Sequence, residues 1–178
     1  MPAELHSPNI GLYQLGKGIV RFDRFDSSGL PTGLRDVGNV PNLTINVAEE
    51  VIEHYSARMG IKTLDTILPV SVKATFKFIL EEFDRENVRM ALLGQTGTWT
   101  IHGLTSFIIQ GVLDFWPTNQ VGPMYHLQVW NARLRPTGDI GMIDDTAIGK
   151  MDFEFDAQPD LVNHPTSPYF DLTLLASS

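Results

Sequence analysis

Seven acidic side chains fall within residues 139–160, and Lys150 is the only basic residue that offsets them. Asp152, Glu154 and Asp156 alternate with apolar residues, so a strand would place their carboxylates on one face. Paired carboxylates can act as the acid and base of a glycosidase, and clustered ones can bind calcium. No EF-hand-like loop is present. A solvated strand face is the ordinary interpretation, a face that repels DNA phosphates is a sharper one, and a hydrolase stays open as an alternative.

The other residues that could do chemistry form no local motif. The five histidines have no metal-ligand spacing and no HExxH helix, so each is interpreted as a surface or satisfied structural histidine. Residues 16–18, Gly-Lys-Gly, lack the GxxxxGK[ST] spacing of a phosphate-binding loop, and no GxSxG nucleophile elbow occurs. We therefore predict no catalytic, cofactor-binding or metal-binding residue, and no enzymatic activity.

Composition narrows the class of protein further. With 178 residues, of which 43% are hydrophobic, the chain can form one domain with a real core. The net charge of −8 argues against a sequence-reading nucleic-acid-binding protein, which needs a basic footprint. Cysteine is absent, which excludes disulfides and thiolate metal sites. No stretch resembles a signal peptide or approaches the ~18 apolar residues of a membrane span, so we expect a soluble protein made in a cytoplasm.

Alternation of apolar and polar residues predicts a long β-hairpin. Residues 43–55 have strand periodicity, and their phase slips near Glu49 and Glu50, as a β-bulge would cause. Residues 70–83 would form the partner strand, with apolar side chains on one face and Lys73 among the polar side chains of the other. This hairpin is the feature that first suggests self-assembly.

The connection between these two strands, residues 56–69, is far longer than the ~2–5 residues of a tight hairpin. A disordered loop would contain fewer apolar residues, so we expect this one to bury them against another subunit or against its own domain. The candidate self-assembly residues are Arg58, Met59, Ile61, Lys62, Leu64, Ile67 and Leu68.

One short helix has visible end signals. Asp84 is the predicted N-cap, and Gly94 is predicted to lie just past the last turn. Val88, Ala91 and Leu92 are spaced to form its buried stripe. Residues 1–16 are interpreted as an N-terminal arm and residues 17–178 as a single β-rich domain. Further strands are predicted at residues 18–25, 34–40, 98–106, 107–115, 125–134, 149–157 and 170–175.

The order of these elements resembles the tail tube, or major tail, proteins of long-tailed bacteriophages. The resemblance covers about residues 16–95, and beyond them only strand content matches. It rests on GKGIVRF at residues 16–22, PTGLRDVGNVP at 31–41, EHYSARMG at 53–60, and FDRENV followed by ALLG within 83–94.

The resemblance implies a β-sandwich or partial barrel with one short flanking α-helix and a long β-hairpin loop, an architecture shared with the type VI secretion tube protein. Such subunits form hexameric rings that stack into a hollow tube, and strands from six subunits close its inner barrel. The implied partners are copies of the chain, with tape-measure, tail terminator and baseplate or tail-tip proteins. The implied location is the virion tail, after synthesis and assembly in the host cytoplasm.

Carried over to this chain, the resemblance gives residues 56–69 a contact with the neighbouring ring, and the N-terminal arm a similar role. A net acidic lumen would let DNA pass without specific binding, because phosphates gain nothing from carboxylates. No cofactor is expected. A small-ligand-binding β-barrel remains the alternative, and its oligomeric state would distinguish it. The polar face that would line either the lumen or the exterior comprises Lys73, Lys77, Asp152, Glu154 and Asp156.

Overall fold

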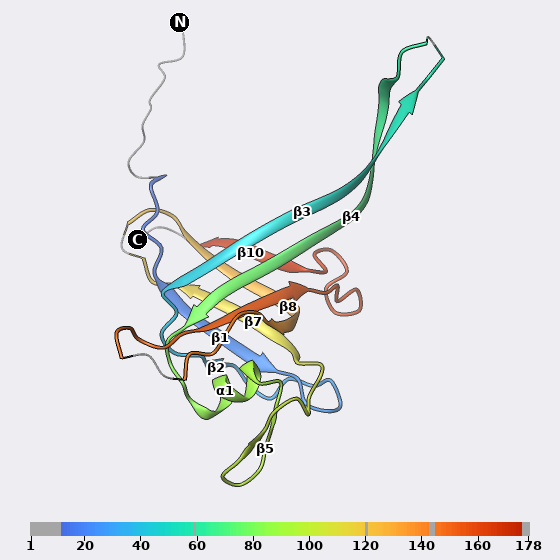
Figure 1. The fold of residues 1–178 in the computed structure, drawn as a ribbon. Helices are drawn as coiled ribbons and strands as arrows, with labels where there is room; N and C mark the ends of the chain where they lie inside the picture. The colour runs from blue at the N-terminus through green and yellow to red at the C-terminus, as the bar shows by residue number, and fades with distance from the viewer. Residues whose placement is uncertain (1–11, 59, 120, 143–144, 176–178) are drawn as a thin grey trace, which may run out of the picture.

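The computed structural model describes residues 12–58, 60–119, 121–142 and 145–175. The chain is mainly β-structure, with one short α-helix and an eight-stranded antiparallel sheet that does not close (Figure 1). This confirms the predicted fold class. In chain order the elements are β1 Gly18–Arg24, β2 Arg35–Asp36, β3 Asn42–Ser56, β4 Thr63–Leu80, α1 Arg85–Ala91, β5 Gln95–Thr96, β6 Ile101–His102, β7 Gln110–Pro117, β8 Met124–Pro136, β9 Met151–Ala157 and β10 Phe170–Leu175.

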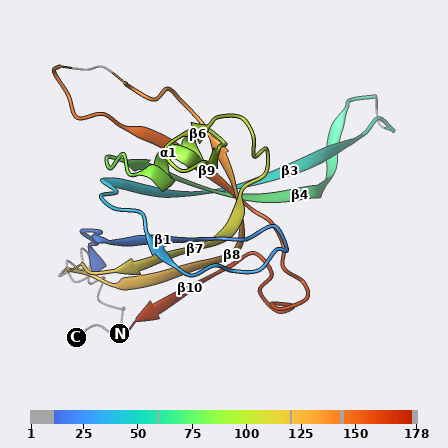
Figure 2. The ribbon, with the colours of Figure 1, turned by 90° about the horizontal axis from the view of Figure 1, so that it is seen from below.

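Strand β8 divides the sheet. The strand order is β2-β1-β7-β8-β9-β4-β3, and β10 pairs with β8 outside this path. Along one edge of β8, residues 124–129 pair with β10 and residues 132–136 pair with β9. The sheet therefore splits near residues 130–131, and Figure 2 shows β3 and β4 on one side of β1, β7 and β8, with β10 on the other.

Phenylalanines from β4 and β9 form the centre of the core. Phe78 stacks on Phe153 and Phe155, with ring centroids 5.5 and 5.3 Å away, and Phe22 of β1 lies 5.0 Å from Phe155. All four side chains are at most 3% exposed. Because side chains alternate across a strand, only one face of β4 enters this core. The other face is left for polar residues.

The start of α1 confirms the predicted N-cap. The Asp84 carboxylate accepts a hydrogen bond from the Asn87 backbone N–H at 2.7 Å, which satisfies one of the free donors of the first turn. The predicted end is wrong by one residue: Leu93, and not Gly94, has the positive φ of 46° that ends the helix. No helix in the described ranges is long and apolar enough to cross a membrane.

The buried face of α1 differs from the predicted stripe. Val88 and Ala91 are partly buried against the core, but Leu92 is 38% exposed. The fully buried positions are Asn87 and Met90. Asn87 can be buried because its amide donates to two backbone carbonyl oxygens, at 2.8 and 3.0 Å. Hydrophobic spacing cannot reveal a polar side chain whose partners lie elsewhere in the chain.

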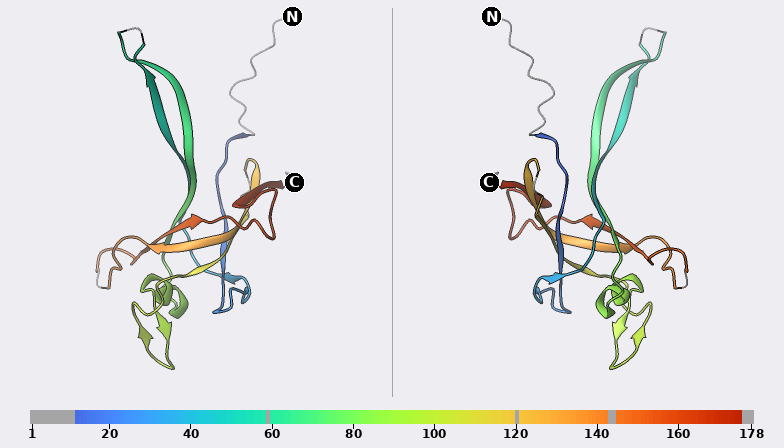
Figure 3. Two further views of the ribbon diagram at one scale, coloured as in Figure 1. Left: turned by 90° about the vertical axis from the view of Figure 1, so that its right-hand side faces the viewer. Right: turned by 90° about the vertical axis from the view of Figure 1, so that its left-hand side faces the viewer.

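The predicted loop at residues 56–69 is wrong. Strand β4 begins at Thr63, so only residues 57–62 connect it to β3. The two strands pair almost to the tip of a hairpin that projects far beyond the body (Figures 1 and 3). Several residues expected in a loop therefore lie in a strand.

A register shift explains both the predicted phase slip and the misplaced loop. The pairing of β3 with β4 shifts between Glu50 and Val51, at the place where the sequence predicts a bulge. Pro69 lies opposite Val51 at this shift. Proline breaks an ordinary central strand but is tolerated at a bulge or an edge. The strand therefore continues through Pro69, which the sequence pattern places at the end of the loop.

Two other predicted strands are much shorter than expected. The return strand at residues 34–40 is reduced to β2, because the Asp36 carboxylate accepts the Gly38 N–H at 2.9 Å and Gly38 turns the chain with a φ of 95°. Residues 98–106 contain only the two-residue strand β6, with a turn before it and another after it. The strands predicted at residues 18–25, 125–134, 149–157 and 170–175 are confirmed within about two residues at each end.

Candidate self-assembly surface

The projecting hairpin, β3 and β4 with residues 57–62, exposes apolar side chains on paired strands. Along β4, Phe76 is fully buried and Ala74 is 7% exposed, whereas Val72 is 61% exposed. These three side chains share one face, so the apolar face of β4 leaves the core and continues into solvent. Val47, which lies opposite Ala74 on β3, is 67% exposed. An exposed apolar strip of this kind is typical of a surface that a partner covers.

The structure places most of the predicted self-assembly residues on this hairpin. Met59 lies outside the described residues, and the other six are all exposed. Their role in assembly stays a prediction. Three lie in the turn at the tip, and three lie on β4 where a loop was expected: Arg58, Ile61 and Lys62, and Leu64, Ile67 and Leu68.

Polar contacts order the far end of the hairpin. His54 Nδ1 lies 2.6 Å from a carboxylate oxygen of Asp65 across the strands. The Tyr55 hydroxyl donates a hydrogen bond to the Glu53 carboxylate. This bond is the main cause that raises the pKa of Tyr55, and desolvation is the smaller cause. The Lys62 ammonium lies 5.2 Å from the centre of the Tyr55 ring. These contacts join exposed side chains of β3, β4 and Lys62 next to the turn, where no core residue supports the strands.

The outer edge of β3 is unpaired in the described part of the chain. This strand has 15 residues and ends the sheet order, with β4 as its partner on one side. The backbone N–H and C=O groups along such an edge can pair with a strand of another molecule. The hairpin thus offers both apolar side chains and free backbone groups to a partner.

The opposite face of the sheet, across β4, β9 and β8, carries five ion-paired side chains, which we name the charged ladder: Lys73, Lys77, Arg135, Glu154 and Asp156. Lys77 Nζ lies 2.8 Å from the Glu154 carboxylate, and Lys73 Nζ lies 3.0 Å from the Asp156 carboxylate. Arg135 contacts both carboxylates, with its Nε 2.8 Å from Asp156. The ladder ties β4, β9 and β8 together across the sheet.

The ladder corrects the sequence analysis in two ways. Glu154 was expected on a solvated face, but it is only 9% exposed because Lys77 and Arg135 cover it. Arg135 was missed, although its alternation with buried Leu134 along β8 was a usable signal. Asp152 is exposed and lies opposite Ile79, outside the ladder. The assignment of this face to a lumen or an exterior stays a prediction.

Substituting Glu154→Gln should lower the free energy of unfolding by about 1–2 kcal/mol, since a largely buried carboxylate loses two charged hydrogen-bond donors. The two cations are about half exposed, so water limits the loss. Urea unfolding followed by circular dichroism measures it. Asp152→Asn, an exposed site on the same strand, is the matched control and should change stability by less than about 0.5 kcal/mol. Equal effects at the two sites would contradict a stabilising ladder.

Two histidines outside the hairpin, His126 and His164, have structural partners. His126 Nε2 lies 2.7 Å from a carboxylate oxygen of Asp114, in a mostly buried pair. The His164 ring stacks on Trp130 with centroids 3.7 Å apart. No group of three or more histidine or acidic side chains among the described residues is placed to hold a metal ion. The contacts of His126 and His164 fit the interpretation of these two histidines as structural.

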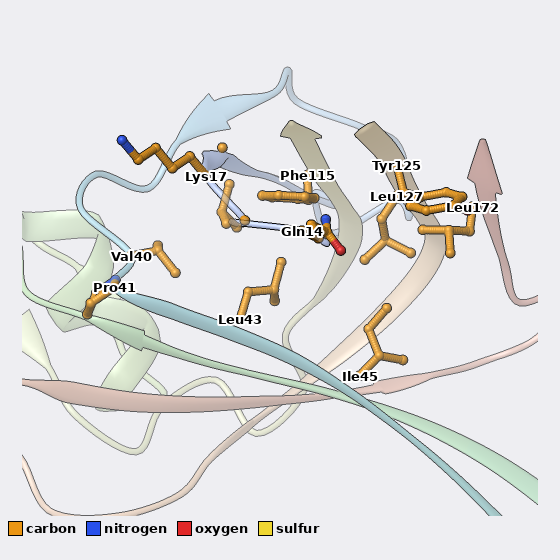
Figure 4. A pocket seen from close by; sticks show the side chains of 13 residues that line it. Gln14, Lys17, Val40, Pro41, Leu43, Ile45, Phe115, Tyr125, Leu127 and Leu172 are labelled. Atoms are coloured by element: carbon orange, nitrogen blue, oxygen red, sulfur yellow. The ribbon is translucent and has the colours of Figure 1, made fainter. Parts of the chain in front are cut away.

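An apolar cleft of about 360 Å³ lies where the two parts of the sheet separate (Figure 4). Val40 and Leu43 line one side, and Phe115, Leu127 and Leu172 line the other. The cleft is open because β3 and β10 do not pair with each other. It is the feature on which a ligand-binding alternative depends.

The fold and these surfaces define a class of protein: an open antiparallel β-sheet with a projecting, partly apolar hairpin and an ion-paired opposite face. Residues 13–109 match the family described as "Protein of unknown function UCP028589", and the chain belongs to this family. The match includes α1 and the whole projecting hairpin. No curated protein matches the sequence.

Two solved structures are similar to the chain at 11% sequence identity. One is a chain of the PVC sheath–tube complex, from an extracellular contractile injection system in the extended state; the match covers 96% of this chain and 95% of that chain, with a TM-score of 0.47. The other is from the tail of an empty GTA particle with C6 symmetry, covering 89% and 96%, with a TM-score of 0.36. Both TM-scores lie below 0.5, so neither structure assigns a function to this chain.

Proposed function

We propose that the chain is a structural, non-enzymatic subunit that assembles with copies of itself into a tube of the kind found in phage tails. The projecting hairpin is the observation that carries the proposal. An isolated two-stranded hairpin is marginally stable in water, and this one also holds apolar side chains in solvent. A neighbouring copy that covers the hairpin would offset both costs.

In the proposed assembly, six copies form a ring and the rings stack. Pairing of the β3 edge with a strand of the next copy would be a head-to-tail interface, which closes into a ring when the rotation allows. Closure would also protect the 15-residue edge from uncontrolled pairing. The tip of the hairpin, residues 57–62, would then contact the neighbouring ring.

The charged ladder suits the wall of a conduit for DNA. It contains three cations and two carboxylates, and each cation contacts a carboxylate. Nucleic-acid phosphates bind proteins chiefly through lysine and arginine side chains that neutralise them and release their condensed counterions. If this face lines the lumen, its cations already contact carboxylates and would hold DNA phosphates only weakly. This is a second route to passage without specific binding, beside the net acidic lumen considered from the sequence. Tape-measure, terminator and baseplate proteins would be the partners at the ends of the tube in the virion.

Purified wild-type protein should form rings or tubes in negative-stain electron microscopy, and species well above monomer mass in sedimentation velocity. The reason is that the apolar hairpin and the free edge are present on every copy. The measurement is made over a range of protein and salt concentrations. Persistent monomers over the whole range would overturn the proposal.

A small-ligand-binding protein is the second candidate, and the 360 Å³ cleft is the observation that favours it. Oligomeric state separates the two functions, because a ligand-binding domain would remain monomeric at high concentration. It would also leave the exposed apolar strip of the hairpin without a use.

A further inference from the structure

A second pocket, of about 570 Å³, lies beside α1 on the body of the protein. It is lined by residues of β1, the connection from β1 to β2, β2, α1 and β5, together with Ser106 and Ile108. Three arginines face it, Arg24, Arg35 and Arg89, with the carboxylates of Asp26 and Glu86. Arginine side chains seldom gather in a partly buried place without an anion. The partners of each arginine therefore decide what the pocket can hold.

Arg24 and Arg35 differ in their partners. Arg35 is satisfied, with one nitrogen 2.7 Å from the Asp84 carboxylate and another 2.6 Å from the Asn87 amide oxygen. Arg24 has no carboxylate partner in the described residues, and its one hydrogen bond there is to the Ser106 hydroxyl at 3.1 Å. Most of the donors of its guanidinium therefore have no partner among the described residues and are available to water or to another molecule.

Arg89 is also incompletely satisfied. Its terminal nitrogen pairs with Glu86, but its Nε is buried and has no hydrogen-bond partner in the described part of the chain. Burial lowers the pKa of Arg24, and the charge of Arg89 lowers it further, against the opposite effect of Glu86. Arg24 and Arg89 line the same pocket, and an anion that contacts both guanidiniums would stabilise them. A carboxylate fits, because it accepts two parallel hydrogen bonds from a guanidinium.

We propose that this arginine pocket accepts a carboxylate side chain from a second copy of the chain. Two observations identify the occupant. The chain has 21 acidic residues against 13 basic ones, so a copy offers many carboxylates to a cationic pocket. The apolar side chains of Leu104, Phe107 and Ile108, next to Ser106 in the chain, are 59–75% exposed, and a protein surface would cover them where a small anion would not. The proposal rests on the proposed self-assembly but concerns a surface separate from the hairpin.

The first test compares the protein concentration at half-assembly for three full-length proteins by sedimentation velocity. Arg24→Gln should raise the half-assembly concentration at least tenfold over wild type, since the carboxylate of the second copy loses the guanidinium that would bind it. Arg133→Gln, a matched change of an exposed arginine on β8, should change it less than twofold. Thermal unfolding verifies that each variant is folded. If Arg24→Gln is unfolded, Arg24→Lys, which keeps the charge, replaces it and should raise the concentration by a smaller factor.

The second test identifies the occupant. Arg24→Lys protein is mixed as ¹⁴N and ¹⁵N forms, assembled, and treated with a carbodiimide, which joins an amine to a carboxylate in contact with it. We expect cross-linked peptides of mixed isotope between the substituted position and an acidic residue. Cross-links of a single isotope only would overturn the proposal.

The outcomes separate this proposal from the proposed function. If wild type assembles and Arg24→Gln assembles at the same concentration, this proposal fails and the tube proposal stands. If wild type stays monomeric, both fail. An acetate titration of monomeric protein, followed through arginine Nε–Hε signals, tests the other source of carboxylate. Saturable acetate binding, together with unchanged assembly of Arg24→Gln, would identify a free carboxylate ligand and overturn docking of a second copy.

Discussion

Replacing Phe78 with alanine is expected to lower the free energy of unfolding by about 3–5 kcal/mol. Phe78 is 1% exposed and stacks on Phe153 and Phe155 at the centre of the core. The substitution removes the ring from β4 and leaves a cavity between strands that a sheet ladder holds at fixed spacing. A loss of this size is a large part of the ~5–15 kcal/mol that typically stabilises a domain.

Urea unfolding followed by tryptophan fluorescence measures this effect, and Phe107→Ala is the matched control. Phe107 is 75% exposed, so the same chemical change should alter stability by less than about 0.5 kcal/mol. If the two variants lost similar stability, the β4–β9 aromatic cluster would not be the centre of the core. The comparison should be made under conditions in which wild type is monomeric, because assembly adds to apparent stability.

The strands that the sequence predicts well are those whose two faces differ in polarity. In β9, Met151, Phe153 and Phe155 are buried and alternate with acidic residues, so period-two alternation was sufficient. The N-cap at Asp84 was equally local, because an N-cap bonds to residues within one turn. Fold class follows from such local signals, since each strand independently indicates a sheet.

The misplaced loop shows where local signals end. Between Thr63 and Pro69 both faces of the strand are exposed in a single copy, so burial imposes no simple alternation. Proline usually interrupts a strand, so the sequence pattern places Pro69 at the end of the loop. In the structure Pro69 lies opposite Val51 at the register shift, where the strand can accommodate it. Strand structure there depends on cross-strand pairing with β3, which is a long-range property that no window of sequence contains.

The candidate site was predictable only in part for the same reason. Lys73, Lys77, Glu154 and Asp156 were recognised as polar positions on two strands, but nothing in either strand showed that β4 and β9 are neighbours. Their ion pairs, and the part of Arg135 in them, follow from a sheet order in which β9 lies between β8 and β4. The arginine pocket was missed entirely, because it joins a strand, a helix and a loop.

Shortening the projecting hairpin should abolish tube formation and leave the domain folded. The variant deletes residues 49–72 and joins Ala48 to Lys73, a cross-strand pair, through an Asn-Gly turn. Every core residue of β4 from Ala74 onward is retained, so the free energy of unfolding should change by about 1 kcal/mol or less. A variant that unfolds would show that the hairpin supports the body and does more than extend from it.

The loss of assembly should be large because the deleted strands carry most of the exposed apolar strip. Burying one aliphatic side chain contributes about 1.5–3 kcal/mol, so losing two or more such contacts weakens association at least ~100-fold. A milder double variant, Val70→Thr with Val72→Thr, keeps the β-branched shape and the full length of the hairpin and should still raise the half-assembly concentration about tenfold. Its matched control is Val121→Thr with Val162→Thr, two exposed valines outside the hairpin, which should assemble as wild type. Normal tubes from the shortened chain in negative-stain microscopy would show that the hairpin is not the assembly surface. Self-association would then have to depend on the free edge of the remaining sheet.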